Sequence, residues 1–287
     1  MQIEDSLNGL RAQLKIWRDQ HETIAFVPTM GNLHQGHLSL LKKARTFADK
    51  VVVSIFVNPM QFDDPQDLAN YPRTLQNDIQ QLSNADCDLL FTPDSKVMYP
   101  AGLDFHSFVH VPGMDDKLCG LERPGHFDGV ATVVSKLFNM VQPDLAIFGE
   151  KDYQQLLLIR KLVQDFNLPV KIVAAPTCRE ADGLAMSSRN KRLDATQRQR
   201  APMLFAQLSA IKKQLENGEQ NALDAINQSI TTLTEAGFAV DYLEIRRAGD
   251  LMPADLSRDQ NLRILLAARL GEVRLIDNVA VSLSHRR

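Results

Sequence analysis

The sequence contains few cysteines and few aromatic residues. Of 287 residues, three are cysteine, one is tryptophan, and phenylalanine, tyrosine and tryptophan together make up 6%. Cys87, Cys119 and Cys178 lie far apart with no C-x-x-C pair, which excludes a zinc-ribbon spacing and an obvious disulfide framework and is typical of a reducing compartment. The longest apolar runs, such as Val51–Val57, are far too short to span a bilayer.

The chain also lacks an excess of positive charge. Its formal net charge is −3, and a nucleic-acid-binding protein would usually carry a basic excess or a concentrated basic stripe. The first residues, Met1 to Asp5, are acidic and lack the basic and then apolar run of a signal peptide. We therefore expect a cytoplasmic protein that binds neither nucleic acid nor membrane. A composition of 44% hydrophobic and 23% charged residues indicates a globular chain with a sizeable core.

Short apolar runs alternate with helical patterns through about the first 175 residues. Val51–Val57 is apolar on both faces, as a central parallel strand covered by helices should be. Helical stripes occur at residues 40–48, Val130–Val141 and Tyr153–Phe166. The alternation predicts an α/β fold with a Rossmann-like, doubly wound parallel sheet. The expected strands are Thr23–Val27, Val51–Val57, Asp88–Phe91, Phe105–Val111, Asp144–Phe148 and Val170–Ala174.

The pattern changes after Pro176. Gln197–Asn217 is expected to form one long polar helix and Ala222–Glu235 another. Strand-like segments without intervening helices follow at Asp241–Arg246, Arg263–Arg269 and Glu272–Ile276. The sequence thus predicts two domains: residues 1–176 with the parallel sheet, and residues 177–287 as a smaller α+β lid domain.

The first candidate site follows the strand Thr23–Val27. Here His34-Gln35-Gly36-His37 stands at a strand-to-helix turn, where unpaired backbone N–H groups and the helix dipole favour an anion. Gly36 lets a phosphate approach the backbone closely. His34 and His37 share one face of the first helical turn and can donate hydrogen bonds to phosphoryl oxygens. The competing interpretations are a metal site and capping histidines, but the spacing differs from H-E-x-x-H.

Two further segments are candidates for the same nucleotide. Gly149-Glu150-Lys151-Asp152 follows the strand Asp144–Phe148, although a charged turn at the start of a helix is an equally simple interpretation. Met186-Ser187-Ser188-Arg189 resembles a degenerate K-M-S-K-S loop of the nucleotidylyltransferase and class I synthetase superfamily. Two hydroxyls and a cation suit the β- and γ-phosphates of ATP, whereas the alternative is a capping pair before a surface helix.

Six motifs in order resemble the pantothenate synthetase (pantoate–β-alanine ligase) family over nearly the whole chain. They are Val27–His37, Phe56–Phe62, Tyr71–Thr74, Arg123–Val130, Phe148–Asp152 and Met186–Asn190, and Leu275–Asn278 also fits. The resemblance implies a two-step reaction with Mg²⁺ and ATP as co-substrate. Pantoate would attack the α-phosphorus to give pantoyl-adenylate and pyrophosphate, and β-alanine would then displace AMP to give pantothenate.

The resemblance also implies roles for individual residues. His37, His34 and Lys151 would be catalytic, with His37 as proton donor or phosphate stabiliser. Gln61 and Gln155 would hold pantoate, and Asn58 and Tyr71 would border the acid pocket; neutral amides suit a hydroxy acid because they both donate and accept. Asp78 would help to hold Mg²⁺. The expected ATP contacts are Met30, Gly31, Asn32, Leu33, His34, Gln35, Gly36, His37, Gly149, Glu150, Lys151, Asp152, Met186, Ser187, Ser188 and Arg189. The family further suggests a homodimer through the first domain.

Other functions remain open at this stage. A nucleotidylyltransferase of cofactor biosynthesis shares the H-x-G-H pattern, but it would need more basic residues for a second phosphate. A non-catalytic nucleotide-binding module would have no reason to keep both phosphate motifs, and a tRNA synthetase would need an anticodon-binding extension. His21, His106, His110 and His126 are interpreted mainly as structural, with His126 a candidate to border the site.

Overall fold

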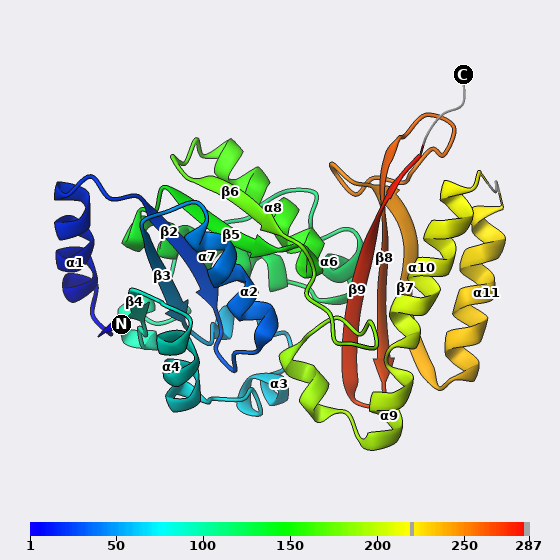
Figure 1. The fold of residues 1–287 in the computed structure, drawn as a ribbon, viewed down its shortest axis with the longest axis horizontal. Helices are drawn as coiled ribbons and strands as arrows, with labels where there is room; N and C mark the ends of the chain where they lie inside the picture. The colour runs from blue at the N-terminus through cyan, green and yellow to red at the C-terminus, as the bar shows by residue number, and fades with distance from the viewer. Residues whose placement is uncertain (219–220, 284–287) are drawn as a thin grey trace. The chain divides into compact units, whose positions relative to one another are not determined.

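A computed structural model describes residues 1–218 and 221–283, and it divides into two compact units (Figure 1). Unit 1 comprises Met1–Glu150 and Leu158–Pro176, and unit 2 comprises Lys151–Leu157 and Thr177–Arg287. Lys151–Leu157 therefore pack with unit 2, although the sequence assigns them to the first domain. Within the described ranges, no helix is both long and apolar enough to cross a membrane.

Unit 1 is built on a six-stranded parallel sheet in the order β1-β4-β3-β2-β5-β6. The strands are β1 (Gln2–Glu4), β2 (Ile24–Thr29), β3 (Lys50–Ile55), β4 (Leu89–Phe91), β5 (Leu145–Gly149) and β6 (Lys171–Ala175). The chain winds outward from β2 to β3 and β4 and then crosses to β5 on the other side of β2. This is the doubly wound Rossmann-like arrangement that the sequence predicts, and its ligands bind where the strand order reverses, between β2 and β5.

Helices cover both faces of this sheet. One core joins Ala25 and Val27 of β2 to Leu41 of α2 and Leu82 of α4, while the intervening Phe26 packs against Phe138 of α7. Alternate residues of a buried strand thus enter opposite layers. The helices and 3₁₀ turns that follow the sheet strands are α1 (Leu7–Asp19), α2 (Gln35–Arg45), η1 (Pro59–Gln61), α3 (Pro65–Ala69), α4 (Leu75–Asn84), α5 (Ser95–Met98), α6 (Leu118–Glu122), α7 (His126–Val141), η2 (Glu150–Asp152) and α8 (Tyr153–Asp165).

One predicted strand is wrong. Residues 105–111 have no strand partner and form an irregular segment in which Phe105 is 85% and Phe108 64% exposed. The main-chain N–H of Val109 donates instead to Oγ1 of Thr132 on α7, at 2.8 Å. The apolar alternation of this segment therefore does not mark a buried sheet face.

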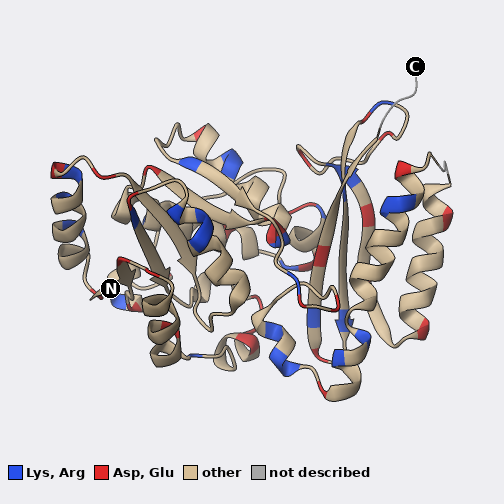
Figure 2. Cartoon of the chain, in the orientation of Figure 1, with Lys and Arg blue, Asp and Glu red and all other residues tan. Residues whose placement is uncertain are grey.

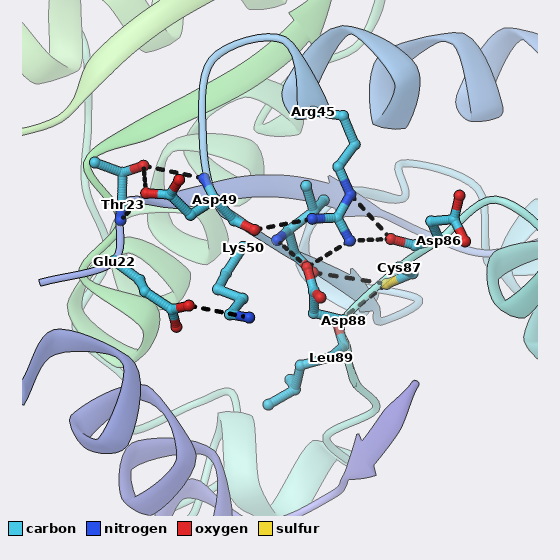
Figure 3. A network of polar contacts seen from close by, with 10 residues as sticks. Glu22, Thr23, Arg45, Asp49, Lys50, Asp86, Cys87, Asp88 and Leu89 are labelled. Carbon is cyan, nitrogen blue, oxygen red and sulfur yellow. Dashed lines mark hydrogen bonds and ion pairs between the residues drawn. The ribbon is translucent and has the colours of Figure 1, made fainter. Parts of the chain in front are cut away.

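Aspartate side chains accept hydrogen bonds from main-chain N–H groups at the amino ends of the parallel strands. A carboxylate oxygen of Asp49 accepts a hydrogen bond from the main-chain N–H of Thr23, just before β2, at 2.9 Å (Figure 3). A carboxylate oxygen of Asp88 accepts one from the N–H of Val51, near the start of β3, at 2.7 Å. Arg45, in the last turn of α2, forms an ion pair with Asp88 at 2.6 Å and also donates to main-chain oxygens. Figure 3 shows these groups as one network that satisfies strand ends which a parallel sheet leaves unpaired.

Unit 2 is a three-stranded antiparallel sheet with two helices on one face. The strands β7 (Phe238–Arg247), β8 (Asn261–Leu270) and β9 (Val273–Ser282) pair in chain order. The helices α10 (Met203–Glu216) and α11 (Ala222–Glu235) lie beside the sheet (Figure 1). They supply Leu204, Leu208, Ile211 and Leu233 to a core shared with the sheet. The predicted α+β character of this region is confirmed.

The predicted single helix Gln197–Asn217 is wrong. The segment forms α9 (Ala195–Arg200), which follows the 3₁₀ turn η3 (Ser188–Arg192), and the separate helix α10. Pro202 lies at the N-cap of α10 and has no N–H to continue a hydrogen-bonded ladder from α9. Proline therefore ends one helix and begins the next.

Candidate active site

The carboxyl ends of β2 and β5 are neighbours in the sheet, as shown by the parallel pairing of Ala25 with Leu145 and of Phe26 with Ala146. β2 leads into the turn that ends at His34, and β5 ends at Gly149. A Cβ atom placed on Gly149 would lie 3.9 Å from the Leu40 side chain of α2. The predicted His34–His37 segment and Gly149 thus lie together at the reversal of strand order, where this type of sheet binds ligands.

His34 and His37 form a reciprocal cap at the start of α2. His34 is the N-cap residue, and its Nδ1 accepts from the Gly36 N–H at 3.1 Å, while Nδ1 of His37 accepts from the His34 N–H at 3.4 Å. The two ring centroids are 4.1 Å apart. A neutral imidazole whose Nδ1 accepts a hydrogen bond carries its proton on Nε2. The cap therefore sets the tautomer in which Nε2 carries the proton of each neutral ring, and an Nε2–H group is the kind of donor that a phosphoryl oxygen requires.

The turn before this cap is held by Asp78 of α4. Gly31 and Asn32 both adopt left-handed backbone conformations, with φ of 78° and 50°. The Asp78 carboxylate accepts from the main-chain N–H groups of Asn32 at 2.9 Å and Leu33 at 2.8 Å, and Thr74 donates to both of its oxygens at 3.2 Å. Asp78 is 1% exposed. This buried carboxylate therefore fixes the shape of the turn that carries Met30 to His34.

Gln61 lies at the end of η1, and buried Asn58 organises it. Nδ2 of Asn58 donates to Oε1 of Gln61 and to the Gly129 carbonyl, both at 3.1 Å. Oδ1 of Asn58 accepts from the Tyr99 hydroxyl at 2.7 Å and from the Met60 N–H at 3.3 Å. Asn58 thereby uses the hydrogen-bonding capacity of its amide within the protein. The structure places it behind Gln61, with 1% exposure, as a positioning group.

Residues of α7 and the segment before it hold the main chain of Gln61. Nδ1 of His126 lies 2.8 Å from the Gln61 carbonyl oxygen, and Arg123 donates to the same oxygen at 3.2 Å. A Cβ atom on Gly129 would lie 2.4 Å from the Met60 carbonyl oxygen, closer than real Cβ atoms approach. Glycine is therefore required for α7 to touch η1. Arg123, His126 and Gly129 all belong to the R-P-G-H-F-D-G-V motif. The sequence reveals this motif but not the contacts that its residues make with η1.

Met30 contacts Gln61 itself, and Tyr71 packs against Phe62, the residue that follows Gln61. Nε2 of Gln61 contacts Sδ of Met30 at 3.2 Å, which joins the segment after β2 to the segment after β3. Tyr71 is 9% exposed and packs edge-to-face against Phe62, with ring centroids 5.5 Å apart. The structure thus brings together the predicted residues Met30, Asn58, Gln61 and Tyr71, with Asp78 as a support.

In unit 2, β9 holds the segment that contains Lys151. Nδ2 of Asn278 donates to the Lys151 carbonyl at 2.9 Å, and the Lys151 ammonium lies 3.7 Å from the Asp152 carboxylate. Gln155 follows on the first turns of α8 and is half-buried. The sequence motif Leu275–Asn278 therefore has a physical function that residue types alone do not reveal.

Asp277, next to Asn278, anchors the hairpin that leads to Met186–Arg189. Its carboxylate pairs with both terminal nitrogens of Arg179, at 2.6 and 2.9 Å. The Arg179 guanidinium also lies 3.8 Å from the centre of the Phe205 ring. Burial raises the pKa of Asp277, while the hydrogen bonds and charge of Arg179 oppose that rise. Arg179 is a functional support that our sequence interpretation missed.

The Met186–Arg189 segment ends in a basic 3₁₀ turn. Ser187 caps η3, with its Oγ accepting from the Arg189 N–H at 3.2 Å. The basic residues in the last turns of η3 and α9 are Arg189, Lys191, Arg192, Arg198 and Arg200. Figure 2 shows the lysine and arginine positions of this part of the chain in blue. A capped turn with a serine hydroxyl and several cations can bind the oxygens of a polyphosphate. Gly149 and Glu150 lie in unit 1, and the predicted residues from Lys151 onward lie in unit 2.

Comparison with known proteins gives a consistent result. A family model described as pantoate-beta-alanine ligase matches residues 2–280. The pantothenate synthetase of Shewanella halifaxensis is 54% identical to this chain, over 97% of this chain and 98% of its own length. That of Ectopseudomonas mendocina is also 54% identical, over 99% of both chains. A pantothenate synthetase structure from Thermus thermophilus aligns with a TM-score of 0.90 at 44% identity, covering 97% of this chain and 99% of its own. A pantoate-beta-alanine ligase from Francisella tularensis, complexed with beta-gamma ATP and beta-alanine, aligns with a TM-score of 0.80 at 38% identity over 97% of each chain.

Proposed function

The chain belongs to the pantoate–β-alanine ligase family and is an ATP-dependent ligase that joins pantoate to β-alanine, and we propose that it does so through a pantoyl-adenylate. In the first step a pantoate carboxylate oxygen forms a bond to the α-phosphorus of ATP, and pyrophosphate leaves. In the second step the β-alanine amine attacks the acyl carbon, loses a proton and displaces AMP. Membership of this family removes the nucleotidylyltransferase, the binding module and the tRNA synthetase from consideration.

The capped pair His34–His37 carries this proposal. Negative charge develops on the phosphate oxygens as the P–O bond to pyrophosphate breaks. Two Nε2–H donors fixed by backbone hydrogen bonds need no reorganisation at that moment, and one such donor contributes about 3–4 kcal/mol. We propose His37 and His34 as catalytic residues, with Met30, Gly31, Asn32, Leu33, Gln35 and Gly36 forming the backbone of the ATP site.

Gln61 and Gln155 are the proposed pantoate contacts. The Gln61 amide accepts from Asn58 at Oε1, which orients Nε2 as a donor and leaves an oxygen lone pair for a substrate hydroxyl. A carboxylate that receives amide hydrogen bonds rather than a full positive charge remains nucleophilic. Asn58 supports this pocket from behind and Tyr71 lines it. Gln155, from unit 2, is proposed on its place in the family motif and its partial exposure.

Lys151 is the proposed third catalytic residue, a cation for the phosphates, with Gly149, Glu150 and Asp152 beside it. Met186, Ser187, Ser188 and Arg189 are proposed to bind the β- and γ-phosphates. Support comes from the cap at Ser187 and from the two anchors on β9, Asp277 and Asn278, which hold these segments within unit 2. Unit 2 is proposed to act as the lid.

Asp78 does not fit the role of a magnesium ligand. Both of its oxygens already accept hydrogen bonds from two main-chain N–H groups and from Thr74, and the side chain is buried. A cation at this position would face those N–H dipoles. We therefore replace the expected metal role of Asp78 with that of a positioning residue. Mg²⁺ is proposed to enter as the ion bound to the phosphates of the substrate ATP.

The chain is proposed to work as a homodimer in the cytoplasm. Four large apolar side chains of unit 1 are exposed within a short stretch, Leu103 at 42%, Phe105 at 85%, Phe108 at 64% and Leu121 at 64%. Exposed apolar side chains of this size favour association, and a second copy is the partner that the family resemblance suggests. The cytoplasm supplies the ATP that the reaction consumes, and the described cysteines are free thiols.

Transfer of an isotope tests the adenylate directly. Pantoate labelled with ¹⁸O in its carboxylate should give AMP that carries one ¹⁸O, because the attacking oxygen stays on phosphorus when the amine displaces AMP. ATP–pyrophosphate exchange should require pantoate and Mg²⁺ but no β-alanine. Formation of ADP with labelled phosphate would show attack on the γ-phosphorus and would refute the adenylate, while leaving the ligase activity in place.

A further inference from the structure

A cluster of metal-ligating side chains lies outside the site described above. His110, Asp115 and Asp128 each offer one ligand atom, and these three atoms all lie within 4.8 Å of one another; no other such group of three occurs in residues 1–218 and 221–283. Asp128 is in the first turn of α7, whereas His110 and Asp115 belong to the irregular segment before α6. The sequence alone indicates a structural role for His110 and no particular function for the two aspartates.

The separations of these atoms suit a bound cation. His110 Nδ1 is 2.9 Å from Asp128 Oδ1 and 3.4 Å from Asp115 Oδ2. Two ligand atoms that each lie about 2.0–2.2 Å from one divalent ion are about 2.8–3.6 Å apart for bond angles of about 90–110°. Small movements of side chains that are 28–51% exposed would therefore place all three atoms around one ion.

The charges in this cluster also call for a cation. Two carboxylates face one imidazole, and the neighbouring Asp116 is paired with Lys117 at 3.6 Å. The second oxygen of Asp115, Oδ1, is buried and has no hydrogen-bond partner among the described residues. A divalent ion bound at Oδ2 of Asp115 would balance both carboxylates, and bidentate coordination by Asp115 would also give Oδ1 a partner.

We propose that His110, Asp115 and Asp128 bind a divalent transition-metal ion such as Zn²⁺. One imidazole nitrogen with two carboxylates is a donor set for such ions, whereas Mg²⁺ prefers oxygen ligands alone. The ion is structural: it ties the segment around residues 110–115 to the first turn of α7. That turn also carries His126, which holds the Gln61 carbonyl, and Gly129, which touches η1. The metal thus stabilises the support of the pantoate site without taking part in the reaction.

Titration of chelator-treated protein with Co²⁺ and Zn²⁺ tests the site. Equilibrium dialysis should give one tightly bound ion per chain, Co²⁺ should show d–d absorption, and Zn²⁺ should raise the melting temperature. His110→Ala and Asp115→Asn should weaken binding about tenfold or more and abolish the thermal shift. Asp116→Asn is the matched control, because it removes a neighbouring carboxylate that is not a ligand, and it should bind like the wild type.

Three results would overturn the proposal. Saturable binding could be absent up to about 1 mM, far weaker than a structural ion. Binding could be equal in the wild type and both ligand variants, which would move the ion elsewhere, for example to His34 and His37. Mg²⁺ in tenfold excess could displace Zn²⁺, which would contradict the imidazole ligand. Circular dichroism of each variant checks that loss of binding does not arise from unfolding.

Discussion

The carboxylate of Asp78 accepts a hydrogen bond from the main-chain N–H of Leu33 at 2.8 Å, across 45 residues of sequence. This contact joins α4 to the turn after β2 and, with the bond from Asn32, sets the direction in which α2 begins. A single buried side chain on a neighbouring helix therefore controls the geometry of the His34–His37 cap. The function of Asp78 follows from these partners rather than from its charge alone.

Replacement of Asp78 by asparagine should destabilise the ligand-free protein. The side-chain NH₂ group of the new asparagine would face the main-chain N–H of Asn32 or Leu33, and neither donor would then have an acceptor. A buried unsatisfied donor costs about 1–3 kcal/mol. The free energy of unfolding, measured in urea, should fall by that amount, and the KM for ATP should rise. Asp86→Asn is the control, because Asp86 is an exposed carboxylate of the same unit and its loss should change neither quantity. A variant of normal stability that requires more Mg²⁺ would instead support a metal ligand.

Substitutions of His34 and His37 should distinguish their role in capping α2 from their role in catalysis. His34→Asn keeps a side-chain acceptor at the N-cap but removes the Nε2–H donor, so stability should be retained while adenylation slows. His34→Ala should lose the donor and in addition about 1 kcal/mol of stability. His37→Ala should slow pantoate-dependent ATP–pyrophosphate exchange by about 10²–10³-fold, as expected for loss of one transition-state donor.

The exchange rate and urea unfolding of these three proteins provide the measurement. His21→Asn is the control, since His21 is exposed and has a left-handed backbone, with φ of 60°, that asparagine tolerates. A His37→Ala enzyme with wild-type turnover would reduce the histidine pair to a helix cap and would remove the main support for the phosphate site.

The sequence predicted the sheet because its central strands are apolar on both faces. Val51–Val57 corresponds to β3, and the H-x-G-H and G-E-K-D segments fall at strand ends as expected. β1 was missed: its three residues, Gln2, Ile3 and Glu4, are too few and too polar to show a pattern, and the strand exists through its pairing with β4. Phe105–Val111 has the composition of a strand without a neighbour to pair with.

The candidate site could likewise be predicted only in part from the sequence. Residues expected to touch substrate could be proposed from motifs, whereas the groups that position them could not. The partners Asn278 and Lys151 are 127 residues apart, and Arg179 and Asp277 are 98 apart. Hydrogen bonds over such separations depend on how the chain folds, and no local pattern in one sequence reveals them. The same holds for Asp78, for which the family resemblance implied a metal role: the N–H groups that donate to it lie 45 and 46 residues away in the sequence.

Gly129→Ala should impair pantoate binding more than ATP binding. The added Cβ would lie 2.4 Å from the Met60 carbonyl, so α7 and η1 must separate and Gln61 must move with η1. Overpacking of this kind costs about 1–3 kcal/mol. Steady-state kinetics should show a raised KM for pantoate and a nearly unchanged KM for ATP. Gly249→Ala, where a Cβ meets nothing within 4 Å, is the control. An unchanged KM for pantoate would mean that η1 adapts without displacing Gln61.

Thr23 should make the stability of unit 1 depend on pH. Its side-chain hydroxyl donates to Asp49 at 2.6 Å, and that bond, followed by the Thr23 main-chain N–H, holds the pKa of Asp49 below its ordinary value of 3.8. A carboxyl whose pKa is lower in the folded state stabilises the protein above its unfolded pKa, and this contribution is lost as the pH falls through the folded pKa.

Thr23→Val should therefore be less stable than the wild type at pH 7, with the difference shrinking below pH 3.8. Urea unfolding of the variant against Thr46→Val, whose hydroxyl bonds only to the Lys43 carbonyl, provides the comparison. A difference that stays constant from neutral to acid pH would show that Thr23 acts through packing and through the hydrogen bond that its hydroxyl accepts from the Asp49 main-chain N–H at 3.0 Å, and that the aspartate network in Figure 3 does not depend on the Asp49 charge.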